Sequence, residues 1–171
     1  MDKSKYSYLF SNVLRIDDLN ALNNGLFIVV LHVDKIPPHI GLCIDQKFYS
    51  LKTNGKDFAV PIISIQKILM NKKISAAFIS VHSSIDIVKV EQVYNEAGDF
   101  INDGSTCLEP LNNLFKPDRE IQVITDLLID LENKNMIGKT FTLNLPYDHN
   151  GIFKYTRDDI ISRIETLKNY V

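Results

Sequence analysis

One stretch, residues 26–52, constrains the fold more than any other, because it reads as three consecutive β-strands. Its first run, residues 26–33, is a continuous apolar block rich in β-branched residues, which is typical of a strand buried on both faces. Pro37 and Pro38 end this run, since proline lacks the backbone donor that a sheet needs. A short polar turn at residues 45–47 separates the other two runs and predicts an antiparallel hairpin. We therefore expect a three-stranded meander.

His39 opens the second of these strands. Strand alternation puts His39, Gly41 and Cys43 on one face. The other face is uniformly aliphatic, and we expect it to be the core side. His39 would then point away from the core, beside a glycine that leaves room for a partner to approach. A lone histidine at a strand start is most often structural, so its role depends on what the rest of the chain brings to it.

Length and charge limit the class of protein. The chain has 171 residues and a formal net charge of −2, which suits a single domain over residues 1–171 with its own core. No cluster of Lys and Arg indicates a nucleic-acid or anionic membrane surface. The N-terminus lacks an apolar signal core, and no apolar run is long enough to span a membrane. We expect a cytoplasmic protein, and the sequence does not predict its oligomeric state.

Helical patterns surround the predicted strands. A short helix is expected within residues 17–25, with longer ones at 61–71, 85–97 and 116–133 and a last one capped by Thr156 and Asp159. Further strands are expected at residues 75–81 and 140–145. The fold class is therefore α+β, with a central antiparallel sheet flanked by helices.

The two cysteines, Cys43 and Cys107, are too few for a disulfide framework and are expected to be free thiols. No metal, nucleotide or dinucleotide motif is present, so no cofactor or metal is expected. Cys43 lies mid-strand, roughly 13 Å along the strand from His39. Thr106 and Glu109 fit a capping box that puts Cys107 in the first turn of a helix. Pro110 instead favours a helix starting there, with Cys107 in the preceding loop.

The order of these features resembles a known family. The segment His39-Ile-Gly-Leu-Cys-Ile-Asp-Gln-Lys-Phe-Tyr-Ser-Leu, followed much later by Cys107 near a helix start, resembles the circularly permuted NlpC-type papain-like fold, which includes lecithin:retinol acyltransferase-like and YiiX-like proteins. The resemblance implies that Cys107 is the nucleophile and His39 the general base. The third polar group would fall at or near Ser50, where the family usually has a stronger orienting side chain.

Three functions remain open from the sequence. The first is a papain-like thiol hydrolase or acyltransferase, in which Cys107 attacks an amide or ester of a small molecule, peptide or lipid. The second is a catalytically degenerate member of the same fold that binds a ligand or serves as a scaffold, which the weak group at Ser50 favours. In the third, His39 and Cys107 are only structural.

The other histidines are weaker candidates. His32 is expected in the core or at a sheet edge, and His149 on the surface. His82, at a strand end, is the reserve site residue.

Overall fold

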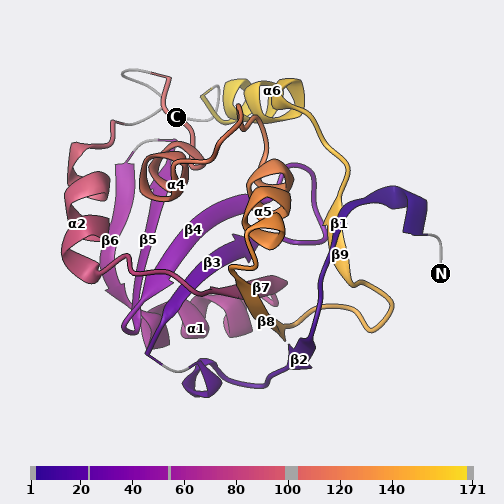
Figure 1. The fold of residues 1–171 in the computed structure, drawn as a ribbon. Coiled ribbons are helices and arrows are strands. Elements are labelled where there is room, and N and C mark those ends of the chain that lie inside the picture. The colour runs from indigo at the N-terminus through magenta and orange to yellow at the C-terminus, as the bar shows by residue number, and fades with distance from the viewer. Residues whose placement is uncertain (1–2, 23, 54, 99–103, 169–171) are drawn as a thin grey trace.

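The chain forms one α+β domain around a seven-stranded sheet (Figure 1). The computed structural model describes residues 3–22, 24–53, 55–98 and 104–168. The strand order is β2-β8-β7-β3-β4-β5-β6, and every neighbouring pair is antiparallel except β2 with β8. The predicted fold class is confirmed in this form. The expectation of a wholly antiparallel sheet is wrong at one edge, where β2 (Val13–Arg15) pairs in parallel with β8 (Ile137–Leu143).

The predicted meander is present at the centre of the sheet. It consists of β3 (Leu26–Leu31), β4 (His39–Ile44) and β5 (Lys47–Lys52). β7 (Ala76–Val81) pairs with the other side of β3, and β6 (Gly55–Pro61) forms the edge beyond β5. The polar sequence of residues 53–57 favours a turn, whereas β6 already begins at Gly55; Asn54 lies outside the described residues. The apolar run of β3 is buried, as its composition predicts.

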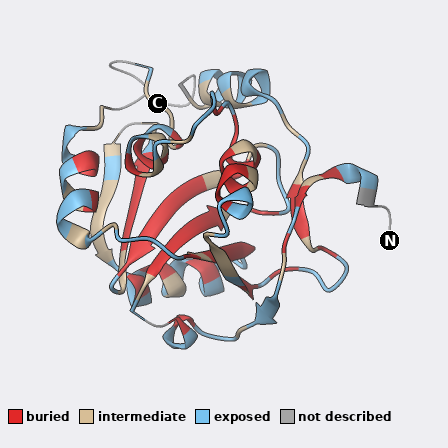
Figure 2. Cartoon of the chain, in the orientation of Figure 1, coloured by how far each residue is buried: buried red, intermediate tan, exposed pale blue. Residues whose placement is uncertain are grey.

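Both faces of the sheet are covered by hydrophobic cores. α2 (Ile87–Glu96), α4 (Glu109–Phe115) and α5 (Ile124–Asn133) pack on one face, and α1 (Ile62–Asn71) packs on the other (Figure 1). The central strands are accordingly buried (Figure 2). The second core, on the α1 face, includes Cys43 and Phe48. The expectation that the His39 face of β4 points away from the core is therefore wrong, because α1 covers that face too.

Gly41 does not leave room for a partner. A Cβ atom built on Gly41 would lie 2.6 Å from Cε2 of Phe48 and 2.7 Å from the backbone oxygen of Tyr49. The space expected beside His39 is thus filled by the ring of Phe48.

Several helices are shorter than their patterns predict. The expected helix at residues 17–25 is a single 3₁₀ turn, Leu19–Ala21, and α2 begins after Asp86, which accepts a hydrogen bond from the N–H of Lys89. The helix expected from residue 116 begins only at Ile124. The carboxylate of Asp126 accepts hydrogen bonds from the N–H groups of Gln122 and Val123, which caps α5 at this point.

The first and last parts of the described chain contribute a two-stranded ladder and a helix. β1 (Tyr6–Leu9) pairs with β9 (Gly151–Phe153) in a separate two-stranded ladder. α6 (Arg157–Lys168) follows, and the reciprocal hydrogen bonds of Thr156 and Asp159 confirm its predicted capping box. His149 is only 5% exposed, and its Nε2 lies 2.7 Å from the backbone oxygen of Gly151. The surface position expected for His149 is therefore wrong.

Candidate functional site

A pocket of about 700 Å³ lies at the end of the sheet where β4 begins and β5 ends. The register of β4 with β5 stops at the pair Gly41 and Ser50, although β5 continues to Lys52. Ile40, Leu51 and Lys52 line the pocket at the point where the two strands are no longer paired. α6 covers the pocket with its apolar side. The volume is in the range of pockets that bind small molecules.

The pocket brings together the two residues on which the sequence hypothesis depends. His39 and Cys107 both line it, although they are 68 positions apart in the chain (107 minus 39). No hydrogen bond joins them among the residues that the structure describes. The structure therefore places the two residues along one cavity without a bond between them, and strand alternation directs the side chain of His39 to the opposite face of β4 from Ile40.

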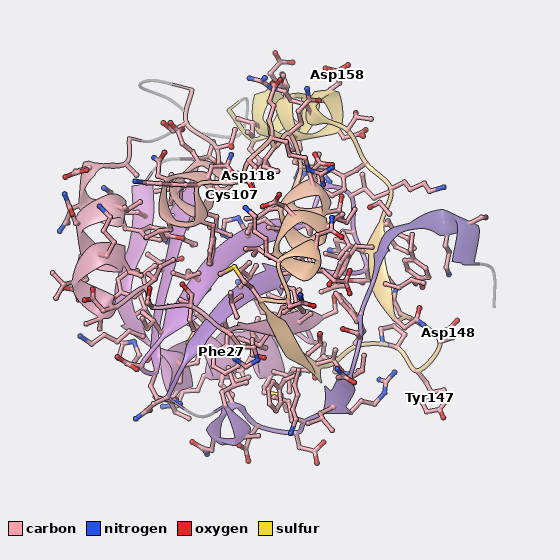
Figure 3. All side chains as sticks on the ribbon, in the orientation of Figure 1. Phe27, Cys107, Asp118, Tyr147, Asp148 and Asp158 are labelled. Carbon is pink, nitrogen blue, oxygen red and sulfur yellow. The ribbon has the colours of Figure 1, made fainter. Side chains whose placement is uncertain are left out.

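Cys107 lies in the turn before α4, close to the helix in the view of Figure 3. Leu108 is the N-cap residue, and no side chain caps the helix. Pro110 is buried in the first turn of α4. The capping-box placement of Cys107 is therefore wrong, and the alternative, with Cys107 in the loop before the helix, is the one observed, though the helix starts one residue earlier than Pro110.

The sulfur of Cys107 lies against the start of β4. Burial raises the pKa of the Cys107 thiol, because a thiolate loses more solvation than a thiol. Hydrogen bonds from the backbone of Ile40 and of Cys107 itself act in the opposite direction. Cys107 is thus a protonated thiol at neutral pH. Its neighbour Ile40 directly follows His39 in the chain.

His39 is also uncharged at neutral pH. Burial lowers the pKa of its imidazole to about 4, and the charge of Asp57 opposes this shift. The positive charge of Lys52 acts in the same direction as burial, and so does that of His32 when it is protonated. The resting site therefore contains a neutral imidazole and a neutral thiol.

Ser50, the third predicted site residue, is fully buried and does not line the pocket. Its hydroxyl donates a hydrogen bond of 2.9 Å to Oδ2 of Asp57. Nζ of Lys52 lies 2.7 Å from the other carboxylate oxygen. Ser50 therefore orients Asp57, and Asp57 is the carboxylate whose charge acts on His39. Sequence reasoning missed Asp57, although the hairpin register that pairs it with Ser50 could have indicated it.

The remaining candidates lie in different places. His32, expected in the core or at an edge, follows β3 and lines the same pocket as His39. His82 lies at a second, more open pocket beside Gly138. Cys43 is buried, and both cysteines are free thiols as expected. Within the described ranges, no group of His, Cys, Asp and Glu could hold a metal ion. None of the described helices has the length and apolar character needed to cross a bilayer.

The chain was compared with family models, curated proteins and solved structures. No family model, no curated protein and no solved structure matches it. The resemblance to the permuted NlpC-type fold therefore stays a prediction based on a few residues. The geometry of the pocket is the basis for a functional proposal.

Proposed function

We propose that the protein is a cysteine-dependent hydrolase or acyltransferase that acts on an amide or ester bond in the pocket at the start of β4. Cys107 is the nucleophile and His39 the general base. The observation that supports the proposal is that these two residues line one pocket of about 700 Å³. The proposal assigns the protein to the cytoplasm, where its two free cysteines stay reduced.

The proposed reaction has two steps, acylation and deacylation of Cys107. In the first, the sulfur of Cys107 forms a bond to the substrate carbonyl carbon, its proton passes to the His39 imidazole, and the amine or alcohol leaves with that proton. In the second, water or another acceptor attacks the thioester, His39 accepts its proton, and the proton returns to the departing sulfur. The backbone N–H groups of Ile40 and Cys107, which bond to the sulfur, are the natural donors for the developing oxyanion.

The protonation states favour general-base chemistry over a preformed ion pair. Because the thiol and the imidazole are both neutral, proton transfer has to accompany the attack of the sulfur. The proposal requires the side chain of His39, which leaves β4 on the face opposite Ile40, to rotate at the start of the strand into hydrogen-bond contact with Cys107 when substrate binds. The charge of Asp57 favours the imidazolium that forms.

The test is to trap the thioester. With a p-nitrophenyl ester as substrate, we expect a burst of p-nitrophenolate and the mass of one acyl group on Cys107. Cys107→Ala should abolish both signals, and His39→Gln should slow acylation by about 100-fold, the usual contribution of a general base. The measurements are stopped-flow absorbance and peptide mass spectrometry.

Cys43→Ala is the matched control. Cys43 is the other free thiol, but it is buried in the second core and lies outside the pocket, so its loss should leave the burst unchanged. Acylation that persists at the same rate in His39→Gln, or that occurs equally on Cys43, would contradict the assignment.

A second candidate is a ligand-binding or scaffold protein without turnover. Strand alternation favours this candidate. The side chain of Ile40 lies in the core that Cys107 packs against, and the neighbouring side chain of His39 leaves β4 on the opposite face, away from the thiol. The low pKa of His39 also makes it a weak base. Under this alternative, the wild-type protein and Cys107→Ala bind the same ligand equally well and neither forms a thioester.

A further inference from the structure

The pocket that contains His39 and Cys107 is lined by basic and apolar side chains. The chain as a whole has 21 acidic and 19 basic residues. Among the described residues, however, no Asp or Glu lines the pocket, whereas Lys35, Lys52 and Arg163 do, together with His32 and His39. The positive character is therefore a local property of this cavity and does not follow from the overall composition.

Three of these side chains form a cluster at one side of the pocket. The charges of Lys35 and Arg163 both act on the imidazole of His32, which places the three groups near one another. Asp34 is the acidic group near this cluster, and its carboxylate accepts a hydrogen bond from the hydroxyl of Ser75. Lys52 differs from the cluster because it is paired with Asp57.

Lys35 and Arg163 are exposed, and neither side chain has an ion-pair or hydrogen-bond partner within the described ranges. Two unpaired cations beside an imidazole present hydrogen-bond donors and positive charge to whatever enters the pocket. Carboxylate and phosphate groups are the ligands that such donors recognise.

The rest of the lining is apolar. α6 contributes Ile160, Ile164 and Leu167, which are only partly buried although they face the cavity. The loop before β4 contributes Ile36, Pro37 and Pro38. Burial of an apolar chain against these side chains would remove further apolar surface from water, which is a favourable contribution to binding.

We propose that the pocket binds an amphiphilic acyl compound with one anionic head group, with the head group at His32, Lys35 and Arg163 and the apolar chain beneath α6. As an assignment of substrate class, the inference rests on the proposed function, because the acyl carbonyl has to reach Cys107. Binding itself requires no chemistry and can be measured separately.

The test is calorimetric titration of the full chain with three matched probes. N-decanoylglycine has a chain, an amide carbonyl and a carboxylate, its glycinamide analogue lacks the charge, and N-acetylglycine lacks the chain. We expect N-decanoylglycine to bind at least about tenfold more tightly than either analogue, since tenfold corresponds to one charge-assisted hydrogen bond. Equal binding of N-decanoylglycine and its glycinamide analogue would overturn the inference.

Variants in α6 locate the head group. Arg163→Glu should weaken binding of N-decanoylglycine by about tenfold or more and leave binding of the glycinamide unchanged. Arg157→Glu is the matched control, because Arg157 is an exposed arginine of the same helix that does not line the pocket. Equal weakening by both variants, or by neither, would overturn the placement of the head group.

Two further measurements distinguish binding in the pocket from the proposed chemistry and from contact with a membrane. Cys107→Ala should still bind N-decanoylglycine, so failure to trap a thioester refutes the proposed function and leaves the binding result intact. Conversely, thioester formation without selective binding of the anionic amphiphile refutes only this inference. The protein is also tested for co-sedimentation with phosphatidylglycerol vesicles. If it sediments with the vesicles but does not bind soluble N-decanoylglycine, the basic residues contact a membrane surface and the inference is overturned.

Discussion

Gly41→Ala is expected to destabilise the protein by about 3 kcal/mol, which is near the upper end for overpacking a well-packed interior. The added methyl group would lie 2.6 Å and 2.7 Å from Cε2 and Cζ of Phe48 and 2.7 Å from the backbone oxygen of Tyr49. Phe48 is 1% exposed and cannot swing away, and Tyr49 belongs to a paired strand. The measurement is the free energy of unfolding from urea denaturation followed by circular dichroism.

A double-mutant cycle shows whether the ring of Phe48 is the cause. Phe48→Leu removes both ring atoms that the methyl group would meet, so Gly41→Ala should cost less in that background by at least about 1 kcal/mol, the size of coupling that contacting residues show in such cycles. Gly138→Ala is the control at another glycine of the sheet. Its methyl group would meet mainly the side-chain atoms of Ser80 and His82, which can rotate. A loss below about 1 kcal/mol for Gly41→Ala would contradict the close packing described between β4 and β5.

The centre of the fold follows from local sequence signals. The apolar run of β3, the diproline before His39 and the polar turn before β5 place three strands to within two residues. Pro61 and the spacing of Ile62, Ile65, Ile68 and Leu69 likewise predict α1, although Ile68 is exposed. These signals suffice because each strand and turn is specified by residues that are neighbours in the chain.

Other parts of the fold depend on distant pairing. β2 and β9 have three residues each, too few for a periodicity, and each is held by a partner more than 120 residues away. The start signal at residues 116–118 and the spacing of Ile121 from Ile124 predict that the helix ending at Asn133 starts early, but Ile121 is buried without helical geometry. Helical spacing alone therefore overestimates the length of α5, because the Asp126 cap determines where it begins.

The site was predictable only in part. Cys107 and His39 could be chosen by residue type and order, and the structure places both in one pocket. Asp57 was missed because its role depends on the register of β5 with β6, which pairs it with Ser50. The cluster of His32, Lys35 and Arg163 was missed for a similar reason: His32 and Lys35 lie in the loop before β4, whereas Arg163 comes from α6 at the other end of the chain. No local pattern links these segments.

Between pH 4 and pH 8, the largest effect of pH on stability is expected from His39. The folded imidazole stays neutral down to about pH 4, whereas in the unfolded chain it takes up a proton near its ordinary pKa of 6.5. Between these values the unfolded state binds more protons, so stability is complete above about pH 6.5 and falls as the pH drops toward 4. The difference of 2.5 pH units (6.5 minus 4) corresponds to about 3 kcal/mol.

His39→Gln should remove this part of the pH dependence, because glutamine does not titrate. Urea denaturation at intervals from pH 4 to pH 8 measures it as the difference in unfolding free energy between wild type and variant. We expect the difference in unfolding free energy between wild type and variant to change by about 3 kcal/mol between pH 4 and pH 8. A difference that is the same at every pH would report only the packing of the new side chain. Parallel curves would mean that His39 is not held neutral by burial.

The same protonation behaviour has a consequence for the proposed chemistry. A general base with a pKa of about 4 is already unprotonated at pH 5, so the rate of Cys107 acylation should change little between pH 7 and pH 5. An ordinary histidine would lose most of its activity as a base over that interval, because it protonates near pH 6.5. Asp57→Asn removes the charge that opposes burial, lowers the His39 pKa further and makes it a weaker base, so acylation by this variant should be slower at every pH. A rate that falls through pH 6.5 in the wild type would show that the imidazole is solvated during the reaction and that burial does not determine its charge there.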